Sequence, residues 1–318
     1  MKIDKLKIVF RQVEPKDLEK EYIIYPYVQT LIDRTYFQKT SAIANVESYL
    51  EQGNEIQLEV EKTIAILRLF RVCSVKYISY DLDSESIVWT RKVIGRFGNL
   101  NYLNFANVNT LEFTESNKEN FIIFFQKLAN IIPKNFYNLG IENKEMVHLG
   151  IAYRHYCEAL LSNTSLEEKI TKAVIGLESL ILAENQEIAF RFCIRGAKIL
   201  SLLNYSAIEV KKKLKVAYSI RSTFAHGDDI ELEKEVKKLD NDYNSKDFLI
   251  EVLDYLRVLI ITIIVLSKQN EFIKVSKGVI NFEKKKLLEL VDNSLIDKEQ
   301  EKHLEDIFKD VNLLISYS

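Results

Sequence analysis

SLEEKITKAVIGLESLILA, residues 165–183, is the stretch of sequence that decides the fold. Its first four residues match a capping box, in which the Ser165 hydroxyl accepts a backbone N–H and Glu168 reaches back to the first turn. Apolar residues then recur every three or four positions, as on one face of a helix: Ile170, Val174, Leu177 and Ile181. The stretch therefore predicts an amphipathic helix that packs within a helical domain.

Helical spacing continues on both sides of this stretch. Further helices are expected over residues 144–161, 188–203, 206–225 and 247–268, with two more between residue 281 and the C-terminus. The sequence thus predicts a helical bundle over residues 144–268 and a helical C-terminal extension over 269–318. Residues 133–143 combine Pro, Asn and Gly and are the expected boundary.

Residues 1–135 have a different pattern and predict a small α+β module. Helices are expected at Glu14–Arg34, at about 40–52 and at 117–132. Segments rich in alternating, β-branched or aromatic residues predict strands: 55–61, Leu67–Cys73, 75–80, 86–93 and 110–114. The fold class expected for the whole chain is mainly α.

The composition limits the kinds of partner and site that are expected. Charged residues make up 28% of the chain, but the net charge is only −2, so a nucleic-acid partner needs a local basic patch. Three scattered cysteines show no ligand spacing and predict buried free thiols, no metal site and a reducing cytoplasm. Three charged residues interrupt the apolar run at 249–266, which predicts a buried helix and no membrane partner.

The segment that combines candidate catalytic residues is Tyr218-Ser-Ile-Arg221-Ser-Thr-Phe-Ala-His226-Gly227. It places a fixed cation and a base that titrates near neutrality just before a helix-ending glycine. On an unbroken helix, five positions put Arg221 and His226 about 140° apart. Either the last turn deviates and brings His226 towards Arg221, or a second copy of the chain completes the site. By spacing alone, an Arg and a His at this position also fit capping and solvation of an ordinary helix end.

This segment resembles the signature of HEPN domains of the ApeA-like group, through Tyr218, Arg221, Ser222, His226 and Gly227. Two upstream segments, Ala173–Ala183 with Glu178 and Ile188–Leu200 with Arg191 and Arg195, are similar to further family motifs in the same order. The resemblance covers residues 145–268. Many active HEPN members have Asn, Asp or His directly after the motif arginine, where this chain has Ser222.

The resemblance implies a bundle that forms a homodimer and acts as a metal-independent endoribonuclease without a cofactor. Arg221 and His226 are the implied catalytic residues, and the expected products carry 2′,3′-cyclic phosphate and 5′-OH ends. Family habit implies anti-phage defence or a toxin-type system, with an antitoxin or regulatory protein as a further partner. It also implies a sensor or regulatory role for the module at residues 1–135. The alternative is a catalytically silent HEPN module that binds RNA or a partner protein.

Other candidates have two interpretations. Ser222, Tyr218, Glu178, Arg191 and Arg195 are expected to support the site or bind substrate, but Tyr218 also fits core packing, and Glu178, Arg191 and Arg195 also fit ion pairs between helices. A run of lysines is expected to attract the RNA backbone, although it also fits a solvated helix face: Lys211, Lys212 and Lys215. No nucleotide-cofactor, metalloprotease or serine-hydrolase motif is present.

Overall fold

The computed structural model describes residues 6–11, 27–32, 61–73, 81–82, 93–94, 115–133, 146–184, 186–228, 231–240, 243–276 and 279–318. The chain divides into two compact units. One comprises Met1–Ala65 and Val75–Leu103, and the other comprises Ile66–Ser74 and Asn104–Ser318. Most of the described residues are helical, so the expected mainly α fold is confirmed.

The first unit contains two short antiparallel strand pairs. Strand β1 (Leu6–Arg11) pairs with β2 (Tyr27–Ile32), with Leu6 opposite Ile32, and β3 (Asp81–Leu82) pairs with β4 (Val93–Ile94). The prediction of a helix through Arg34 is therefore wrong at β2. Pro26 disfavours helix continuation at this point, and the β-branched and aromatic residues of β2 favour a strand.

The expected strand at Leu67–Cys73 is also wrong, because residues 61–70 form a helix. Every residue from 63 to 70 is buried. A helix that is buried on all sides shows no amphipathic face, so a short and largely apolar run of this kind cannot be distinguished from a buried strand. Apart from Glu61 and Val93, the residues of the other expected strands lie outside the described residues, as does the helix expected at 40–52.

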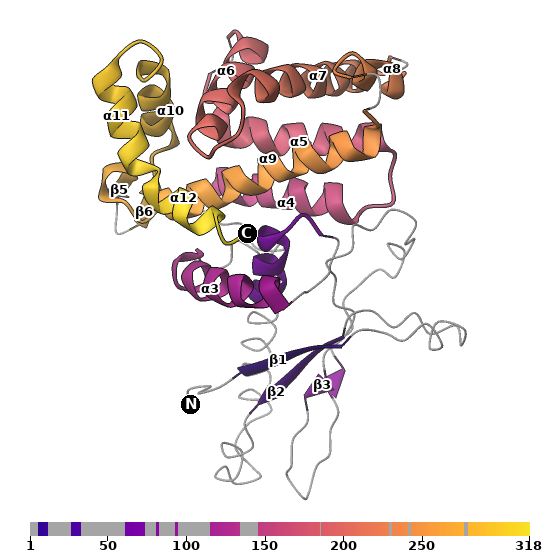
Figure 1. Cartoon of the computed structure of the whole chain (residues 1–318), viewed down its shortest axis with the longest axis vertical. Coiled ribbons are helices and arrows are strands. Elements are labelled where there is room, and N and C mark those ends of the chain that lie inside the picture. The colour runs from indigo at the N-terminus through magenta and orange to yellow at the C-terminus, as the bar shows by residue number, and fades with distance from the viewer. Residues whose placement is uncertain are drawn as a thin grey trace, which may run out of the picture. The chain divides into compact units, whose positions relative to one another are not determined.

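The second unit is helical (Figure 1). Its helices are α3 (Glu115–Ile131), α4 (Val147–Leu161), α5 (Leu166–Ile181), α6 (Ile188–Ser201), α7 (Ala207–His226), α8 (Leu232–Lys237), α9 (Ser245–Leu266), α10 (Lys284–Asn293), α11 (Lys298–Ile307) and α12 (Lys309–Ile315). A short 3₁₀ helix, Asn270–Phe272, leads into the hairpin β5 (Ile273–Ser276) and β6 (Val279–Phe282), which the sequence patterns did not reveal.

Helix α5, which the capping box at Ser165 begins, is the central element of the bundle. It contacts α4, α6, α7, α9 and α10. The Ser165 side chain accepts the Glu168 backbone N–H, which confirms the predicted helix start. A Cβ at Gly176 would lie 2.7 Å from the Leu256 side chain, so this glycine permits the close approach of α5 and α9.

The apolar run at 249–266 lies within α9, whose residues from Leu256 to Leu266 are all buried. Its Arg257 donates to the carbonyls of Leu69 and Phe70 at 2.7 and 3.2 Å, where helix 61–70 ends. This contact satisfies carbonyls that a helix end leaves unpaired. None of the helices in the described part of the chain has the length and apolar character needed to cross a membrane.

The C-terminal extension packs on the bundle. Helix α10 contacts α5 and α6, and α12 contacts α3 and α9. Lys198 on α6 bonds Glu301 on α11 at 2.5 Å, and the Asn312 amide donates to the Leu202 carbonyl at 2.7 Å. Residues 269–318 therefore belong to the same compact unit as the bundle, and they supply one wall of the hollow described next.

Candidate functional site

A surface hollow of about 870 Å³ lies where α4, α5, α7 and the start of α10 meet. Arg221 lines it together with two other residues that the sequence singled out, Glu178 and Tyr218. The other lining residues are His148, Leu182, Ala183, Glu184, Ile188, Phe282, Glu283, Lys284, Lys285, Lys286 and Glu289. The volume falls in the range of sites that hold small ligands or single nucleotides.

Arg221 is held by α7 against α5. One of its terminal nitrogens donates to Glu178 at 3.1 Å, and its guanidinium carbon lies 5.9 Å from the centre of the Tyr218 ring. Arg221 remains 31% exposed, so the ion pair does not bury it. Among the described residues, the Arg221 Nε and the Glu178 Oε1 have no hydrogen-bond partner. Both of these atoms are buried, so the donor capacity that Arg221 retains for a ligand lies at its second terminal nitrogen, which makes no hydrogen bond among the described residues.

Glu178 is the more enclosed partner of this ion pair. Burial raises the pKa of the Glu178 carboxyl, and the Arg221 cation partly offsets that rise. A carboxyl with a perturbed pKa beside a cation in a hollow is typical of functional sites, although structural ion pairs produce the same effect.

His226 is the last residue of α7 and is exposed. Gly227 follows with φ 76°, and the backbone N–H groups of Gly227 and Asp228 bond the carbonyls of Phe224 and Thr223. This pattern is a Schellman ending, which needs a residue that tolerates positive φ and so explains the glycine.

Because α7 continues to His226, the last turn does not swing this side chain towards Arg221. The two residues lie on helix faces about 140° apart. His226 is also absent from the lining of the hollow. Within one chain, the two implied catalytic residues are therefore not brought together.

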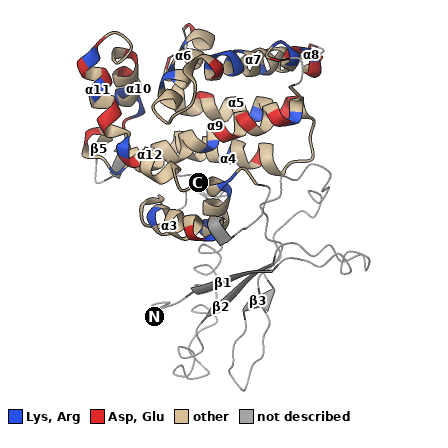
Figure 2. Ribbon diagram, in the orientation of Figure 1, with Lys and Arg blue, Asp and Glu red and all other residues tan. Residues whose placement is uncertain are grey.

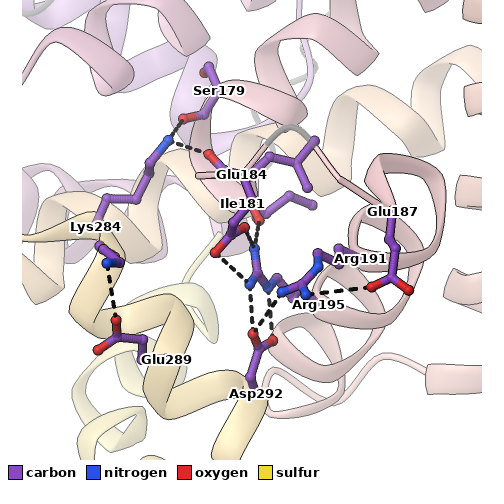
Figure 3. Close-up of polar contacts among 11 residues, drawn as sticks. Ser179, Ile181, Glu184, Glu187, Arg191, Arg195, Lys284, Glu289 and Asp292 are labelled. Atoms are coloured by element: carbon purple, nitrogen blue, oxygen red, sulfur yellow. Dashed lines mark hydrogen bonds and ion pairs between the residues drawn. The ribbon is translucent and has the colours of Figure 1, made fainter.

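Arg195 lies in a buried cluster of ion pairs that joins helices. Its side chain is 2% exposed and lies between Glu184, at 2.8 Å, and Asp292 of α10, at 2.6 Å (Figure 3). A further N–H reaches the Ile181 carbonyl at 3.3 Å. The bond from Arg195 lowers the pKa of Glu184 to about 2. This arrangement is the ion pair between helices that the sequence left open for this residue.

Arg191 lies one turn before Arg195 and is more exposed. It pairs with Glu187 at 3.5 Å and with Asp292 at 3.7 Å (Figure 3). Neither Arg191 nor Arg195 lines the hollow. Both contribute to the attachment of α10.

The remaining candidates lie along α7, where Lys and Arg are frequent (Figure 2). Lys211, Lys212 and Lys215 are exposed, and Lys212 bonds Glu209 at 3.0 Å. Ser222 is partly exposed. The Tyr218 ring lies 5.6 Å from the Phe192 ring and also lines the hollow, so it both packs in the bundle and contributes to the site.

Two residues of the hollow were not expected from the sequence. Lys284 donates to the carbonyls of Ser179 and Leu182 at the end of α5, at 3.0 and 2.5 Å, and burial lowers its pKa to about 8. His148 lies 3.5 Å from the Lys284 ammonium, and its pKa is lowered by burial and by that cation. No spacing in the sequence connects these two residues, which are 136 positions apart.

All three cysteines are free and buried, as predicted. Among the described residues, no group of three or more His, Cys, Asp or Glu side chains is arranged to hold a metal ion. Comparisons with family models, curated proteins and solved structures give no match for the chain. The HEPN resemblance therefore stays a prediction from the sequence motifs.

Proposed function

We propose that the chain is a metal-independent endoribonuclease of HEPN type that needs no cofactor and acts as a homodimer, in anti-phage defence or a toxin-type system. The observation that carries the proposal is the position of Arg221. This cation is partly exposed on the wall of an 870 Å³ hollow, five residues before an exposed histidine on the same helix.

The chemistry follows from the side chains. The His226 imidazole takes the proton of an RNA 2′-OH or gives one to the departing 5′-oxygen. The Arg221 guanidinium binds the phosphate and stabilises the negative charge that develops on the phosphorane. The 2′-oxygen then attacks the adjacent phosphorus, so the products carry 2′,3′-cyclic phosphate and 5′-OH ends, and DNA resists cleavage because it has no 2′-OH.

The divergence of Arg221 and His226 favours a site completed by two protomers. One phosphate cannot contact both residues of a single straight helix when they project about 140° apart. In the dimer, Arg221 of one copy and His226 of the other act on the same phosphate. An antitoxin or regulatory protein is a further expected partner.

The test of the catalytic assignment is expression of the wild type and His226→Ala in cells, followed by analysis of RNA integrity. Loss of the imidazole should reduce cleavage about 10²- to 10⁴-fold. His303→Ala is a matched control, because His303 is an exposed histidine that pairs with Glu271 on another part of the unit. Equal RNA decay in the wild type and His226→Ala would overturn the assignment. In a purified assay, EDTA should leave cleavage intact.

A mixing experiment tests the shared site. Arg221→Ala and His226→Ala are each expected to be inactive, but a dimer formed from one copy of each contains one site with both residues intact. Dissociation and reassociation of the mixture should therefore restore part of the cleavage activity. A mixture no more active than either variant alone would contradict a site shared in this way.

The alternative function is a silent HEPN module that binds RNA or a partner protein. The Arg221–Glu178 ion pair favours this alternative, since a carboxylate already occupies part of the guanidinium. In that case RNA binding persists while wild type and His226→Ala show no difference in RNA integrity.

A further inference from the structure

The hollow has a second wall that lies outside the part of the chain covered by the HEPN resemblance. Residues 282–286, from the end of β6 into α10, line it together with Arg221 and Tyr218, and Lys284 of this segment lies 3.5 Å from His148. The wall includes three consecutive lysines, Lys284, Lys285 and Lys286. The C-terminal extension thus adds cations to a site that the bundle alone leaves open on one side.

The carboxylates around the hollow are engaged by cations. Arg221 binds Glu178, and Arg195 binds Glu184. Glu283 and Glu289 pair with Lys274 and Lys285 at 3.8 and 3.7 Å, which are weak surface contacts.

Lys285 pairs with Glu289, whereas the other two lysines of the second wall bond backbone carbonyls. Lys284 donates to the carbonyls that end α5, and Lys286 donates to the Glu271 carbonyl at 2.8 Å. A carbonyl oxygen satisfies a hydrogen bond but does not neutralise the charge. Within residues 282–286 three lysines outnumber the single carboxylate of Glu283, so this segment carries net positive charge that a phosphate can neutralise.

The lining of the hollow also contains aromatic and apolar residues. The aromatic ones are Tyr218, Phe282 and His148, and the apolar ones are Leu182, Ala183 and Ile188. Bases of single-stranded RNA stack on aromatic side chains, while phosphates bind arginine and lysine. The lining therefore matches a nucleotide with its phosphate better than an inorganic anion alone.

The second wall is rigidly held. Asp292, two turns along α10 from Lys284, binds the buried Arg195 of α6, and Lys284 itself is fixed on the end of α5 (Figure 3). These two attachments set the position of the lysines relative to Arg221 before any ligand binds. Such preorganisation lowers the entropic cost of binding.

We propose that the hollow binds one nucleotide of the RNA strand, with its phosphate between Arg221 on α7 and the lysines at the start of α10. The C-terminal extension is then part of the substrate site. This inference rests on the proposed function, because it assigns the substrate of the same site. It adds residues 282–286 to the residues that contact RNA.

The test measures binding of a fluorescent single-stranded RNA to the full chain carrying His226→Ala, so that cleavage does not interfere. Lys285→Glu is compared with Lys309→Glu, a matched control, because the two lysines are 77% and 75% exposed and each pairs with one carboxylate. Lys285→Glu should weaken RNA binding about tenfold. The slope of the logarithm of the binding constant against the logarithm of the salt concentration should become shallower by about 0.7, the value expected for one lost phosphate contact with a single strand. Lys309→Glu should change affinity less than about twofold.

Three outcomes would overturn the inference. Equal weakening by Lys285→Glu and Lys309→Glu would indicate general electrostatics, and no weakening by Lys285→Glu would exclude the second wall. Competition by 5′-AMP at the affinity of the RNA would assign the hollow to a free nucleotide instead of a strand.

Tyr218→Leu is a second probe of the site. Loss of stacking should weaken RNA binding about 5- to 100-fold, and urea unfolding of the same variant reports whether the bundle is intact.

The two proposals can fail separately. If cleavage depends on His226 but Lys285→Glu leaves RNA affinity unchanged, the nuclease assignment stands and the inference is wrong. If Lys285→Glu weakens binding and His226→Ala does not change RNA decay, the RNA site stands and the nuclease assignment is wrong.

Discussion

Arg195 and Arg221 are two arginines of the same helical unit, and each faces a glutamate from α5 or from the residues just after it. Arg195 is buried and donates to two carboxylates and a carbonyl. Arg221 is partly exposed and donates to one carboxylate on the wall of a hollow. A guanidinium whose donors are used within the protein stabilises the fold, whereas one with spare donors at a cavity can still bind a ligand.

The largest expected effect is loss of stability at Arg195. Arg195→Met removes a buried cation with its charge-assisted hydrogen bonds and leaves Asp292 only its longer contact with Arg191, which should reduce the free energy of unfolding by about 3 kcal/mol. Urea unfolding followed by circular dichroism measures the change. Arg191→Met is the control, because its exposed pairs should contribute less than about 1 kcal/mol. Equal losses in both variants would remove the distinction between the two arginines.

The second effect concerns activity at Arg221. Arg221→Met should lower RNA cleavage about 10²- to 10³-fold, because the charge on the phosphorane loses its stabilising donor. The free energy of unfolding should change by about 1–2 kcal/mol, because Arg221 is partly exposed but its loss leaves the more enclosed Glu178 carboxyl without a cation. Single-turnover cleavage and urea unfolding of the same preparation provide both values. A stability loss as large as that of Arg195→Met would show that Arg221 is also mainly structural.

Local signals in the sequence predicted part of this fold. Helix positions followed from local signals, because Ser165, Ser206 and Asp297 each cap the helix that they precede and Gly227 ends α7. Helix 61–70 and the hairpin β5–β6 were missed, because burial on all sides and a short strand pair produce no distinctive spacing.

The roles of the arginines depend on contacts that the sequence does not contain. Arg195 meets Asp292 across 97 positions, and Arg221 meets Glu178 across 43. Both acidic partners and both arginines lie in helices that the sequence located, but only the packing of α10 determines which arginine is enclosed. The same packing brings Lys284 to the hollow, so residues 282–286 could not be assigned to the site beforehand.

The third effect is an acid dependence of stability at the Arg195 cluster. The pKa of Glu184 is lowered from 4.5 to about 2, so its contribution is present above pH 4.5 and is lost as the pH falls to about 2. The free energy of unfolding of Glu184→Gln should be about 1–2 kcal/mol below that of the wild type at pH 6, because partial exposure screens the pair. Urea unfolding should show this difference shrink towards zero at pH 2. A difference that does not change with pH would contradict the assigned ion pair.

The smallest effect should come from the Glu178–Arg221 pair. Glu178→Gln keeps the shape of the side chain but removes the charge that competes with a phosphate for Arg221. In the His226→Ala background, RNA affinity should rise about two- to fivefold, in line with the modest energy of a partly exposed pair. Asp306→Asn is the control, since it removes a carboxylate that pairs with Lys309 outside the lining of the hollow.

The pH dependence of this last effect has a defined sign. Because burial raises the Glu178 pKa, the wild type loses the competing charge at a higher pH than an ordinary carboxyl would. As the pH falls through that raised pKa, the affinity of the wild type should approach that of Glu178→Gln. An equal gain in Asp306→Asn would attribute the effect to net charge. A loss of affinity in Glu178→Gln would instead indicate that Glu178 orients Arg221 towards the RNA, which would make the ion pair a positioning contact.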